Sequence, residues 1–223
     1  MNVDKIIFDV GANNGDSHIG TALHNPNKLV FAFEPTPKMI DVIKSKTSHL
    51  KNYVLIEKAV SDFEGTASFN VAGQSDWGCS SLLEFSKKSK TKWPGRTDFK
   101  VTDTIEVDVI RLDSFIKEKT IPKIDYIHID TQGSDLEVLK GMGDLIHIVR
   151  AGVMEAGNEK DILYKGQNTL KETIKFLNDN GFEVKDIVSN DPYTNEVNVH
   201  FENPNPKWIQ FKKDKSIDWR RFV

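Results

Sequence analysis

Short, continuous apolar runs that alternate with helical patterns constrain the fold of this chain more than any other feature. Runs rich in Val, Ile and Phe occupy residues 6–10, 28–35, 53–60, 124–130 and 148–156. Their apolarity is continuous and lacks the alternation of a half-exposed strand, which indicates strands covered on both faces, as in a parallel sheet. Strands and helices that follow one another over short connections predict a doubly wound α/β sheet.

Three segments between or after these runs carry the start and stop signals of helices. They are residues 37–50, 135–142 and 168–181. Each follows or begins with a side chain that can accept a hydrogen bond from a free backbone N–H, namely Thr36, Ser134 and Asn168. The second segment also has Glu137 three residues after Ser134, which is the spacing of a capping box. Gly141 and Gly181 predict the ends of the last two helices.

Two regions interrupt this rhythm. Residues 61–112 have strand-like ends around a middle rich in glycine, serine and lysine, and they predict an inserted β-hairpin with a long excursion. Residues 181–203 predict two strands joined by a turn around Asp191 and Pro192, which would add an antiparallel strand to the sheet. Because no internal repeat or linker interrupts the chain, we predict one domain over residues 1–223, with residues 204–223 as a C-terminal extension.

Composition bears on which partners and compartments fit this chain. A net charge of -3 gives no electrostatic reason for nucleic acid or an anionic membrane to be the main partner. A single cysteine, Cys79, excludes an internal disulfide and suits a reducing compartment. The first residues lack the charged start and long apolar stretch of a signal peptide, and no run is long enough to span a bilayer. We therefore predict a cytoplasmic protein.

A turn with little side-chain bulk follows the first apolar run, in the segment "FDVGANNGD". In an open parallel sheet, ligands bind outside the carboxyl ends of the strands, where this turn would lie. Gly11 allows a tight turn there, and Gly15 lets the next helix begin close to a ligand. Glu34 ends the second run, roughly 20 residues on, where an acid can accept hydrogen bonds from both hydroxyls of a ribose. Turn and acid together indicate a ribose-bearing cofactor.

The residues around the glycines favour one such cofactor over another. A dinucleotide site uses G-x-G-x-x-G so that backbone amides can face a pyrophosphate, whereas this turn has asparagines where the central glycine would lie. Asp9, directly before the turn, disfavours a pyrophosphate and suits an ammonium group. S-adenosylmethionine carries an amino acid and a sulfonium in place of phosphates, so the turn favours a methyltransferase. A nicotinamide-dependent oxidoreductase stays open as an alternative, as does a simple turn-capping role for Asp9.

Seven motifs occur in the order and spacing of a known family and cover most of residues 5–200. They are "FDVGANNG", "FEPTP", "KAVSDFEGTASF", "SSL", "VDVIRLDSFI", "IDYIHIDTQGSDLEVLKGM" and "LYKGQNTLKETIKFLNDNGF". On these motifs the chain resembles the FkbM-type methyltransferases. The resemblance implies a seven-stranded, Rossmann-like class I methyltransferase that uses S-adenosylmethionine to methylate a hydroxyl oxygen, often on a sugar or a polyketide.

The resemblance also implies how the turn after the first strand meets the methionine part of the cofactor. Asp9, Gly11 and Gly15 would line that part. Asn13 or Asn14 would lie near its carboxylate.

Further along the chain, the same resemblance implies contacts to the nucleoside. Glu34 would hold the ribose, and Ser61 and Asp62 match the position at which such enzymes meet the adenine edge. A plain turn is the alternative for this pair, because "SDFEG" is rich in turn formers. The segment "HIDTQGSDLE" departs from the family's K-I-D-x-E-G-x-E, with His128 in place of lysine and Gln132 in place of glutamate.

Candidate catalytic residues lie where the later strands are predicted to end. Methyl transfer to a hydroxyl needs an oriented acceptor and a group that takes its proton. Asp130 ends the fourth run, His128 shares its strand face because side chains alternate, and Glu155 is near the end of the fifth run. The alternatives are structural: a turn cap for Asp130, a satisfied core histidine for His128, and a cap or salt bridge for Glu155. Asp130 with Gln132 or Glu155 could hold a hard divalent cation through oxygens, but no spacing requires a metal.

Acceptor specificity is predicted to lie in the excursion at residues 73–100. Trp77 could lie over the crevice as a surface for a sugar face, with Ser80 or Ser81 toward the cofactor, or Trp77 could pack the hairpin against the sheet. The basic run of this loop and the basic, aromatic C-terminus are interpreted as solvated or packed segments. We predict a small-molecule or carbohydrate acceptor, with neither nucleic acid nor membrane as partner, and leave the oligomeric state open, a homodimer included. A non-catalytic module that keeps the fold is the third alternative.

Overall fold

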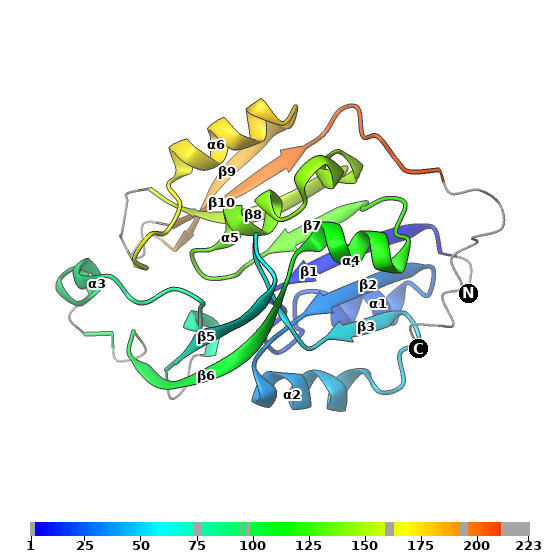
Figure 1. Cartoon of the computed structure of the whole chain (residues 1–223). Helices are drawn as coiled ribbons and strands as arrows, with labels where there is room; N and C mark the ends of the chain where they lie inside the picture. Colours follow the sequence, from blue (N-terminus) through cyan, green and yellow to red (C-terminus); the bar gives the residue numbers. More distant parts are fainter. Residues whose placement is uncertain are drawn as a thin grey trace.

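The strands of the chain form a large sheet and a small one in a computed structural model, shown in Figure 1. The structure describes residues 3–73, 77–93, 95–96, 99–158, 163–191 and 196–210, and the side chains of Trp77, Lys90 and Asp191 are not part of that description. The predicted role of Trp77, the turn at Pro192 and the C-terminus beyond residue 210 therefore lie outside the described residues.

The large sheet has seven strands in the order β3-β2-β1-β7-β8-β10-β9. Its strands are β1 (Lys5–Val10), β2 (Lys28–Phe33), β3 (Tyr53–Ile56), β7 (Tyr126–Ile129), β8 (Ala151–Gly157), β9 (Glu183–Asp191) and β10 (Glu196–Glu202). Strand β10 is antiparallel to β8 and β9, and the other neighbouring pairs are parallel. This confirms the predicted mostly parallel, doubly wound sheet with its C-terminal antiparallel hairpin. The chain winds in opposite directions from β1, so a ligand is expected where β1 and β7 end.

Helices cover both faces of the sheet around β1. On these faces lie α1 (Ile19–His24), α2 (Pro37–Thr47), α4 (Leu112–Lys119), α5 (Asp135–Lys140), α6 (Leu170–Asp179) and the 3-10 turn η2 (Gly143–Ile148). Helix α3 (Lys87–Lys92) and the 3-10 turn η1 (Trp77–Cys79) belong to the insertion and lie away from the large sheet (Figure 1). Apolar residues of α4, α5 and α6 pack with Phe8 and Val10, whereas those of α1 and α2 pack with Ile7 on the opposite face. Because side chains alternate along a strand, β1 supplies two separate core clusters, which explains its continuous apolarity.

The helix starts differ from the prediction in their caps. Thr36 precedes α2, but its side chain makes no capping hydrogen bond. Ser134 makes none to α5 either, so the capping box predicted there is wrong. At α6 the capping box is present, but Thr169 and Glu172 form it, one residue after the predicted cap Asn168. The amide of Asn168 instead donates a hydrogen bond to a glutamate of α5 at 2.6 Å, which explains the shift.

The insertion at residues 61–112 builds the small sheet, in the order β4-β6-β5. As predicted, β5 (Gly65–Ala72) and β6 (Val101–Ile110) form an antiparallel hairpin, which projects from the edge where β1 and β7 end (Figure 1). The strand predicted at residues 53–60 is corrected, because β3 ends at Ile56 and residues Ala59–Val60 form β4, parallel to β6. A tight turn, in which the Lys58 N–H donates to the Ile56 carbonyl at 2.9 Å, redirects the chain between the two sheets.

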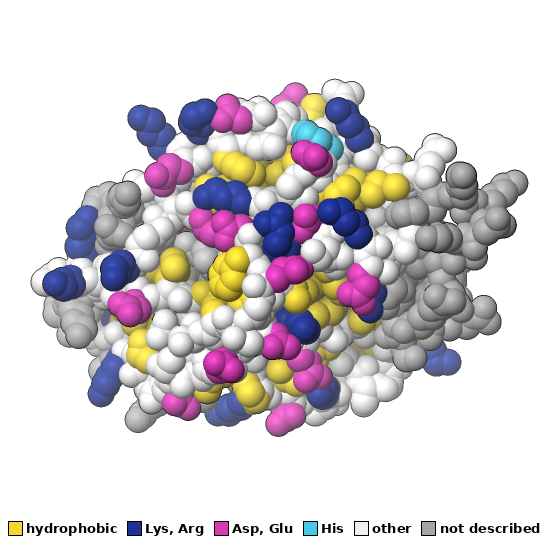
Figure 2. All heavy atoms as spheres, in the orientation of Figure 1, with side chains coloured by type: hydrophobic (Ala, Val, Ile, Leu, Met, Phe, Trp, Pro, Cys, Tyr) yellow, Lys and Arg dark blue, Asp and Glu magenta, His cyan; other side chains and the backbone are white. Residues whose placement is uncertain are grey.

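The surface over α4 mixes both signs of charge. Figure 2 shows basic and acidic side chains interspersed over the described part of this face, and Asp113 pairs with both Arg111 at 3.0 Å and Lys117 at 3.5 Å. Such a face lacks the field of one sign that attracts nucleic acid. No helix in the described ranges has the length and apolarity needed to cross a bilayer. The single-domain organisation and the cytoplasmic location stay predictions.

Candidate active site

The turn after β1 contains three residues with positive φ, namely Gly11 (81°), Asn13 (50°) and Gly15 (81°). A Cβ on Gly11 would lie 1.9 Å from the backbone oxygen of Asp130, so glycine is needed there because two strand ends approach closely. The Gly11 N–H also donates to the Phe33 carbonyl at 3.0 Å. The backbone of the turn is therefore fixed between the ends of β2 and β7. The absence of a side chain at Gly11 makes room for the backbone of Asp130.

Glu34, just after β2, is held by two backbone amides. Its Oε2 accepts from the Asn13 N–H and its Oε1 accepts from the Thr36 N–H, both at 2.8 Å. The residue is only 5% exposed, and burial raises the pKa of its carboxyl to about 7 in spite of these bonds. The Thr36 side chain also hydrogen-bonds this carboxyl. A carboxylate has about four lone-pair sites, so these bonds still leave acceptor capacity on the side of the pocket that Glu34 lines. A fixed, buried acceptor of this kind suits the two adjacent hydroxyls of a ribose.

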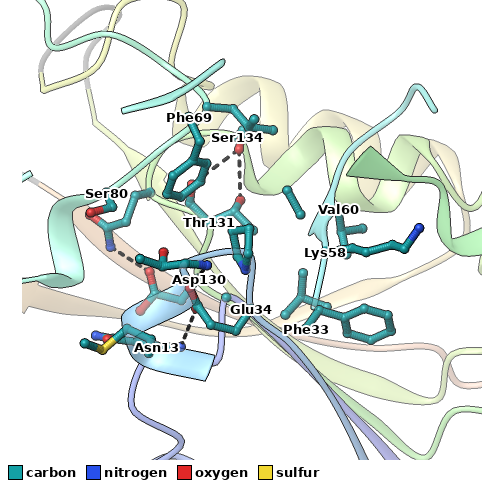
Figure 3. A pocket seen from close by; sticks show the side chains of 18 of the residues that line it. Asn13, Phe33, Glu34, Lys58, Val60, Phe69, Ser80, Asp130, Thr131 and Ser134 are labelled. Atoms are coloured by element: carbon teal, nitrogen blue, oxygen red, sulfur yellow. Dashed lines mark hydrogen bonds between the residues drawn. The ribbon is translucent and has the colours of Figure 1, made fainter. Parts of the chain in front are cut away.

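A pocket lies beside Glu34, at the carboxyl ends of β1 and β2. Its apolar lining comprises Val10, Phe33, Met39, Val60, Phe69 and Leu82. In Figure 3, Phe33 and Val60 lie on one side, and the polar residues Asn13, Glu34 and Asp130 gather on the other. An apolar slot with a few convergent polar groups is the usual form of a small-molecule site, and a nucleoside has this division between a flat base and a hydroxylated sugar. We name it the nucleoside pocket after the ligand that we propose for it below.

Three of the residues predicted to bind the cofactor line the nucleoside pocket: Gly11, Asn13 and Glu34. The others lie outside its lining, and their roles stay predictions: Asp9, Asn14, Gly15, Ser61 and Asp62. Residues 58–60 line the pocket, because the turn after β3 carries the chain along it before Ser61 is reached. The apolar pair Ala59 and Val60 could have indicated this wall of the pocket. The sequence analysis instead assigned both residues to one continuous strand over residues 53–60.

Asp130 follows β7 and lines both the nucleoside pocket and a second, polar pocket. Its Oδ1 accepts a hydrogen bond from Gln132 Nε2 at 2.6 Å. Gln132 has a positive φ of 57°, and its Oε1 accepts from the Tyr164 hydroxyl at 2.8 Å. Because Tyr164 occupies the amide oxygen, the amide nitrogen of Gln132 is directed at Asp130. Sequence reasoning located Asp130 but missed Tyr164, which lies in the seventh family motif but 32 residues from its partner.

The second pocket is built from charged and amide side chains, and we refer to it as the polar pocket. Its polar side chains are Arg96, His128, Asp130, Gln132, Glu155, Asn190, Glu196 and Asn198. Glu155 accepts a hydrogen bond from the Asn190 amide. Burial, and then the neighbouring charges of Asp130 and Glu196, raise the pKa of Glu155 well above its usual range. Such a lining favours a hydroxylated or otherwise polar molecule over an apolar one.

His128 lines the polar pocket, and its Nδ1 lies 2.9 Å from Oδ1 of Asp9. Asp9 is fully buried, and a further ring, that of His18, places its Nδ1 3.3 Å from the same oxygen. Burial acts to raise the pKa of Asp9, but the contacts with the two histidines outweigh it and lower that pKa. Burial likewise acts against a charged His128, but Asp9 outweighs it and the pKa of His128 is raised. His18 had no signal in the sequence.

The insertion reaches the nucleoside pocket through Ser80. Ser80 lines it, and its hydroxyl accepts from the Ala72 N–H at 3.0 Å. Ser81 is fully buried, and its hydroxyl donates to the Gln132 carbonyl at 2.7 Å. Of the two serines predicted to face the cofactor, Ser80 thus lines the pocket and Ser81 braces the loop after β7.

Comparison with protein families matches residues 9–184 to the methyltransferase FkbM domain. The chain is 27% identical over 180 residues to the 2-O-methyltransferase NoeI of Sinorhizobium fredii, and the match covers 78% of this chain and 71% of that protein. It is 25% identical over 153 residues to the hexuronic acid methyltransferase AglP of Haloferax volcanii, where the match covers 68% of this chain and 56% of that protein.

Among solved structures, fibrillarin of Aeropyrum pernix with natively bound S-adenosyl-L-methionine overlays with a TM-score of 0.49 at 14% identity, over 90% of this chain and 66% of that chain. The fold assignment rests on the strand order with β10 antiparallel, and not on this distant overlay. The family match, in contrast, begins at the last residues of β1 and reaches into β9, and so spans most of the chain. The chain belongs to the family of methyltransferases with an FkbM domain.

Proposed function

We propose that this chain is an S-adenosylmethionine-dependent O-methyltransferase that acts on a hydroxyl of a sugar or of another hydroxyl-rich small molecule. The observation that carries the proposal is the junction at Asp130, where the nucleoside pocket with its buried Glu34 meets the polar pocket. Membership of a methyltransferase family supports methyl transfer over the nicotinamide-dependent alternative. Relatives named for 2-O-methylation and for a hexuronic acid support a carbohydrate hydroxyl as the acceptor.

The residues of the nucleoside pocket fit the nucleoside of S-adenosylmethionine. Glu34 offers both hydroxyls of a ribose a buried acceptor that backbone amides already hold in place. Phe33 and Val60 offer an apolar wall to the adenine ring. When bound, S-adenosylmethionine supplies a methyl group that its sulfonium activates. Binding the nucleoside, orienting the acceptor and taking its proton fall to the chain's own side chains.

We assign the acceptor's proton to Asp130. Because Asp130 lines both pockets, its carboxylate stands beside a hydroxyl that faces the methyl donor from the polar side. When the acceptor hydroxyl takes the methyl group that bound S-adenosylmethionine would supply, Asp130 would accept the hydroxyl proton, and S-adenosylhomocysteine would be left as the neutral product. Proton transfer to a positioned base contributes typically about 10²- to 10⁴-fold to a rate. Gln132, held by Tyr164, keeps the carboxylate in position.

We assign the orientation of the acceptor to His128 and Glu155. Both line the polar pocket. The raised pKa of Glu155, caused first by burial, favours its protonated form, which can donate a hydrogen bond to an acceptor oxygen. His128 is held through Nδ1 by Asp9 while its ring lines the pocket. A sugar presents several hydroxyls at once, so a wall with both donors and acceptors is suited to orienting it.

Calorimetric titration with S-adenosylmethionine and S-adenosylhomocysteine tests the nucleoside pocket. We expect micromolar dissociation constants, and we expect Glu34→Gln to weaken both about 10- to 100-fold because one acceptor of the ribose pair is lost. The control is Glu118→Gln, whose side chain is 68% exposed on α4 and which should bind as the wild type does. No binding of either nucleoside by the wild type, or undiminished binding by Glu34→Gln, would contradict the proposal.

The acceptor class is tested by methyl transfer from radiolabelled S-adenosylmethionine to a panel of sugar nucleotides and glycans. We expect label in at least one hydroxylated product and its loss in Asp130→Asn. If the chain binds the nucleoside but labels no acceptor in the panel, the third alternative, a non-catalytic module, replaces the enzyme.

A further inference from the structure

Three side chains with metal-binding groups converge outside the nucleoside pocket, on the sheet face that α1 covers. Asp9 comes from β1, His128 comes from β7, and His18 directly precedes α1. One ligand atom from each lies within 4.8 Å of the other two. We propose that Asp9, His18 and His128 together bind one divalent transition-metal ion, through a carboxylate oxygen and two imidazole nitrogens.

The distances between these atoms fit a single ion. Oδ1 of Asp9 lies 2.9 Å from Nδ1 of His128 and 3.3 Å from Nδ1 of His18. Ligand atoms bonded to one ion at about 2.1 Å are about 3.0 Å apart in octahedral and about 3.4 Å apart in tetrahedral geometry. Two of the three pairs thus already have the spacing that a shared ion requires, and the third pair lies within 4.8 Å. Asp9 and His128 are also fixed to neighbouring strands.

Two buried atoms of the cluster have no hydrogen-bond partner in the described part of the chain: Oδ2 of Asp9 and Nδ1 of His18. His18 is near enough to Asp9 for an ion pair, but the contact lacks the geometry of a hydrogen bond. A fully buried carboxylate oxygen without a partner costs about 1 to 3 kcal/mol or more. An ordinary hydrogen-bonded histidine–aspartate network would give both atoms a partner, whereas these two atoms have none in the described residues. A cation bound between the three side chains satisfies them.

The donor set selects the class of ion. Two imidazoles and one carboxylate suit borderline ions such as Zn²⁺, Fe²⁺ or Mn²⁺, whereas Mg²⁺ and Ca²⁺ prefer sites made of oxygens alone. This site is distinct from the oxygen set of Asp130 with Gln132 or Glu155 that the sequence suggested. Three protein ligands leave at least one position for water, as in open metal sites.

A metal ion here would anchor one wall of the polar pocket. The ring of His128 lines that pocket, and the ring of His18 packs against it with centroids 5.6 Å apart. An ion that binds both rings would fix their orientation. It would also place positive charge close to the carboxyl groups that line the pocket, among them Asp130 and Glu155.

Metal titration of the full chain tests the proposal. The purified protein is stripped with a chelator and dialysed against Zn²⁺ or Co²⁺ alone, and bound metal is counted by mass spectrometry. We expect one ion per chain and, with Co²⁺, a visible absorption band from nitrogen ligation. His18→Phe keeps a ring in place but removes Nδ1, and it should weaken Zn²⁺ binding by at least about 100-fold. His24→Phe, at an exposed histidine of the same helix region, is the matched control and should bind as the wild type does.

A wild-type chain that binds neither ion, or a folded His18→Phe that binds Zn²⁺ as tightly as the wild type, overturns the proposal. Circular dichroism and S-adenosylhomocysteine binding report whether His18→Phe is folded. If it is not, anomalous diffraction from a Zn²⁺-soaked wild-type crystal decides: a peak between Asp9, His18 and His128 supports the site, and its absence there overturns it.

Discussion

The two pockets that meet at Asp130 are built from different material. In the nucleoside pocket the acid is fixed by backbone, since the N–H groups of Asn13 and Thr36 hold Glu34 and the missing side chain of Gly11 makes room for the neighbouring strand end. The polar pocket is lined mostly by side chains of β7, β8, β9, β10 and the insertion. Backbone geometry changes only with the fold, whereas side chains change one at a time. The fold therefore dictates the position of Glu34, and under our proposal the acceptor preference depends on the side chains of the polar pocket.

Disturbing the backbone around the nucleoside pocket is expected to have the largest effect, and the effect is on stability. In Gly11→Ala the new Cβ would lie 1.9 Å from the Asp130 oxygen at a φ of 81°. The overlap and the left-handed strain both destabilise the folded state, so the free energy of unfolding should fall by on the order of 5 kcal/mol. Urea denaturation measures it. Gly20→Ala, where an added Cβ meets nothing within 4 Å, is the control and should change stability by less than about 1 kcal/mol. Equal losses in the two variants would break the comparison.

The junction itself comes next. Asp130→Asn removes the proposed proton acceptor but keeps the size of the side chain, so we expect kcat to fall about 10³-fold with the cofactor dissociation constant almost unchanged. Single-turnover methyl transfer and calorimetry measure the two quantities separately. Asp179→Asn, with a side chain 59% exposed on α6, is the control. Equal loss of turnover and cofactor affinity would assign Asp130 to the nucleoside pocket alone.

The buried acid of the nucleoside pocket should make stability depend on pH. Burial raises the pKa of Glu34 from 4.5 to about 7, so the folded chain keeps a proton that the unfolded chain has lost. The free energy of unfolding therefore falls as pH rises from 4.5 to 7, by about 3 kcal/mol at about 1.4 kcal/mol per pKa unit. Urea denaturation between pH 5 and 8 should show this slope in the wild type and its loss in Glu34→Gln. Parallel curves for the two proteins would contradict the assignment.

The smallest effect is expected from changing Tyr164, which holds Gln132 in place in the polar pocket. Tyr164→Phe removes the hydroxyl that donates to Gln132 at 2.8 Å, so the amide can turn away from Asp130. We expect kcat to fall about 5-fold, stability to fall by about 1 kcal/mol, and cofactor affinity to stay constant. Tyr53→Phe is the control, because the Tyr53 hydroxyl is buried with no hydrogen-bond partner in the described ranges. If the two variants have the same kcat, Tyr164 does not position the junction.

The same contrast explains what could be predicted from the sequence. The strand–helix alternation, the turn with Gly11 and the acid Glu34 were predicted because each depends on residues close together in the chain. The wall at residues 58–60 was assigned to a strand, because the turn before it depends on pairing of β4 with β6, which lies far along the chain. The local sequence pattern thus located the strand ends but not the turn between β3 and β4 that connects the two sheets.

The polar pocket shows why the partners of its side chains could not be predicted from the sequence. His128 meets Asp9 across 119 residues, Tyr164 meets Gln132 across 32, and Asn190 meets Glu155 across 35. No local pattern links such partners, because only the order of strands in the sheet brings them together. His128 and Glu155 were chosen for their places at strand ends, but their partners came from the tertiary structure.

A crystal structure with bound S-adenosylhomocysteine tests the central claim most directly. The account predicts both ribose hydroxyls within hydrogen-bond distance of the Glu34 carboxylate, adenine against Phe33 and Val60, and the sulfur at the boundary next to Asp130. A nucleoside whose ribose lies away from Glu34, or whose base fills the polar pocket, would contradict it.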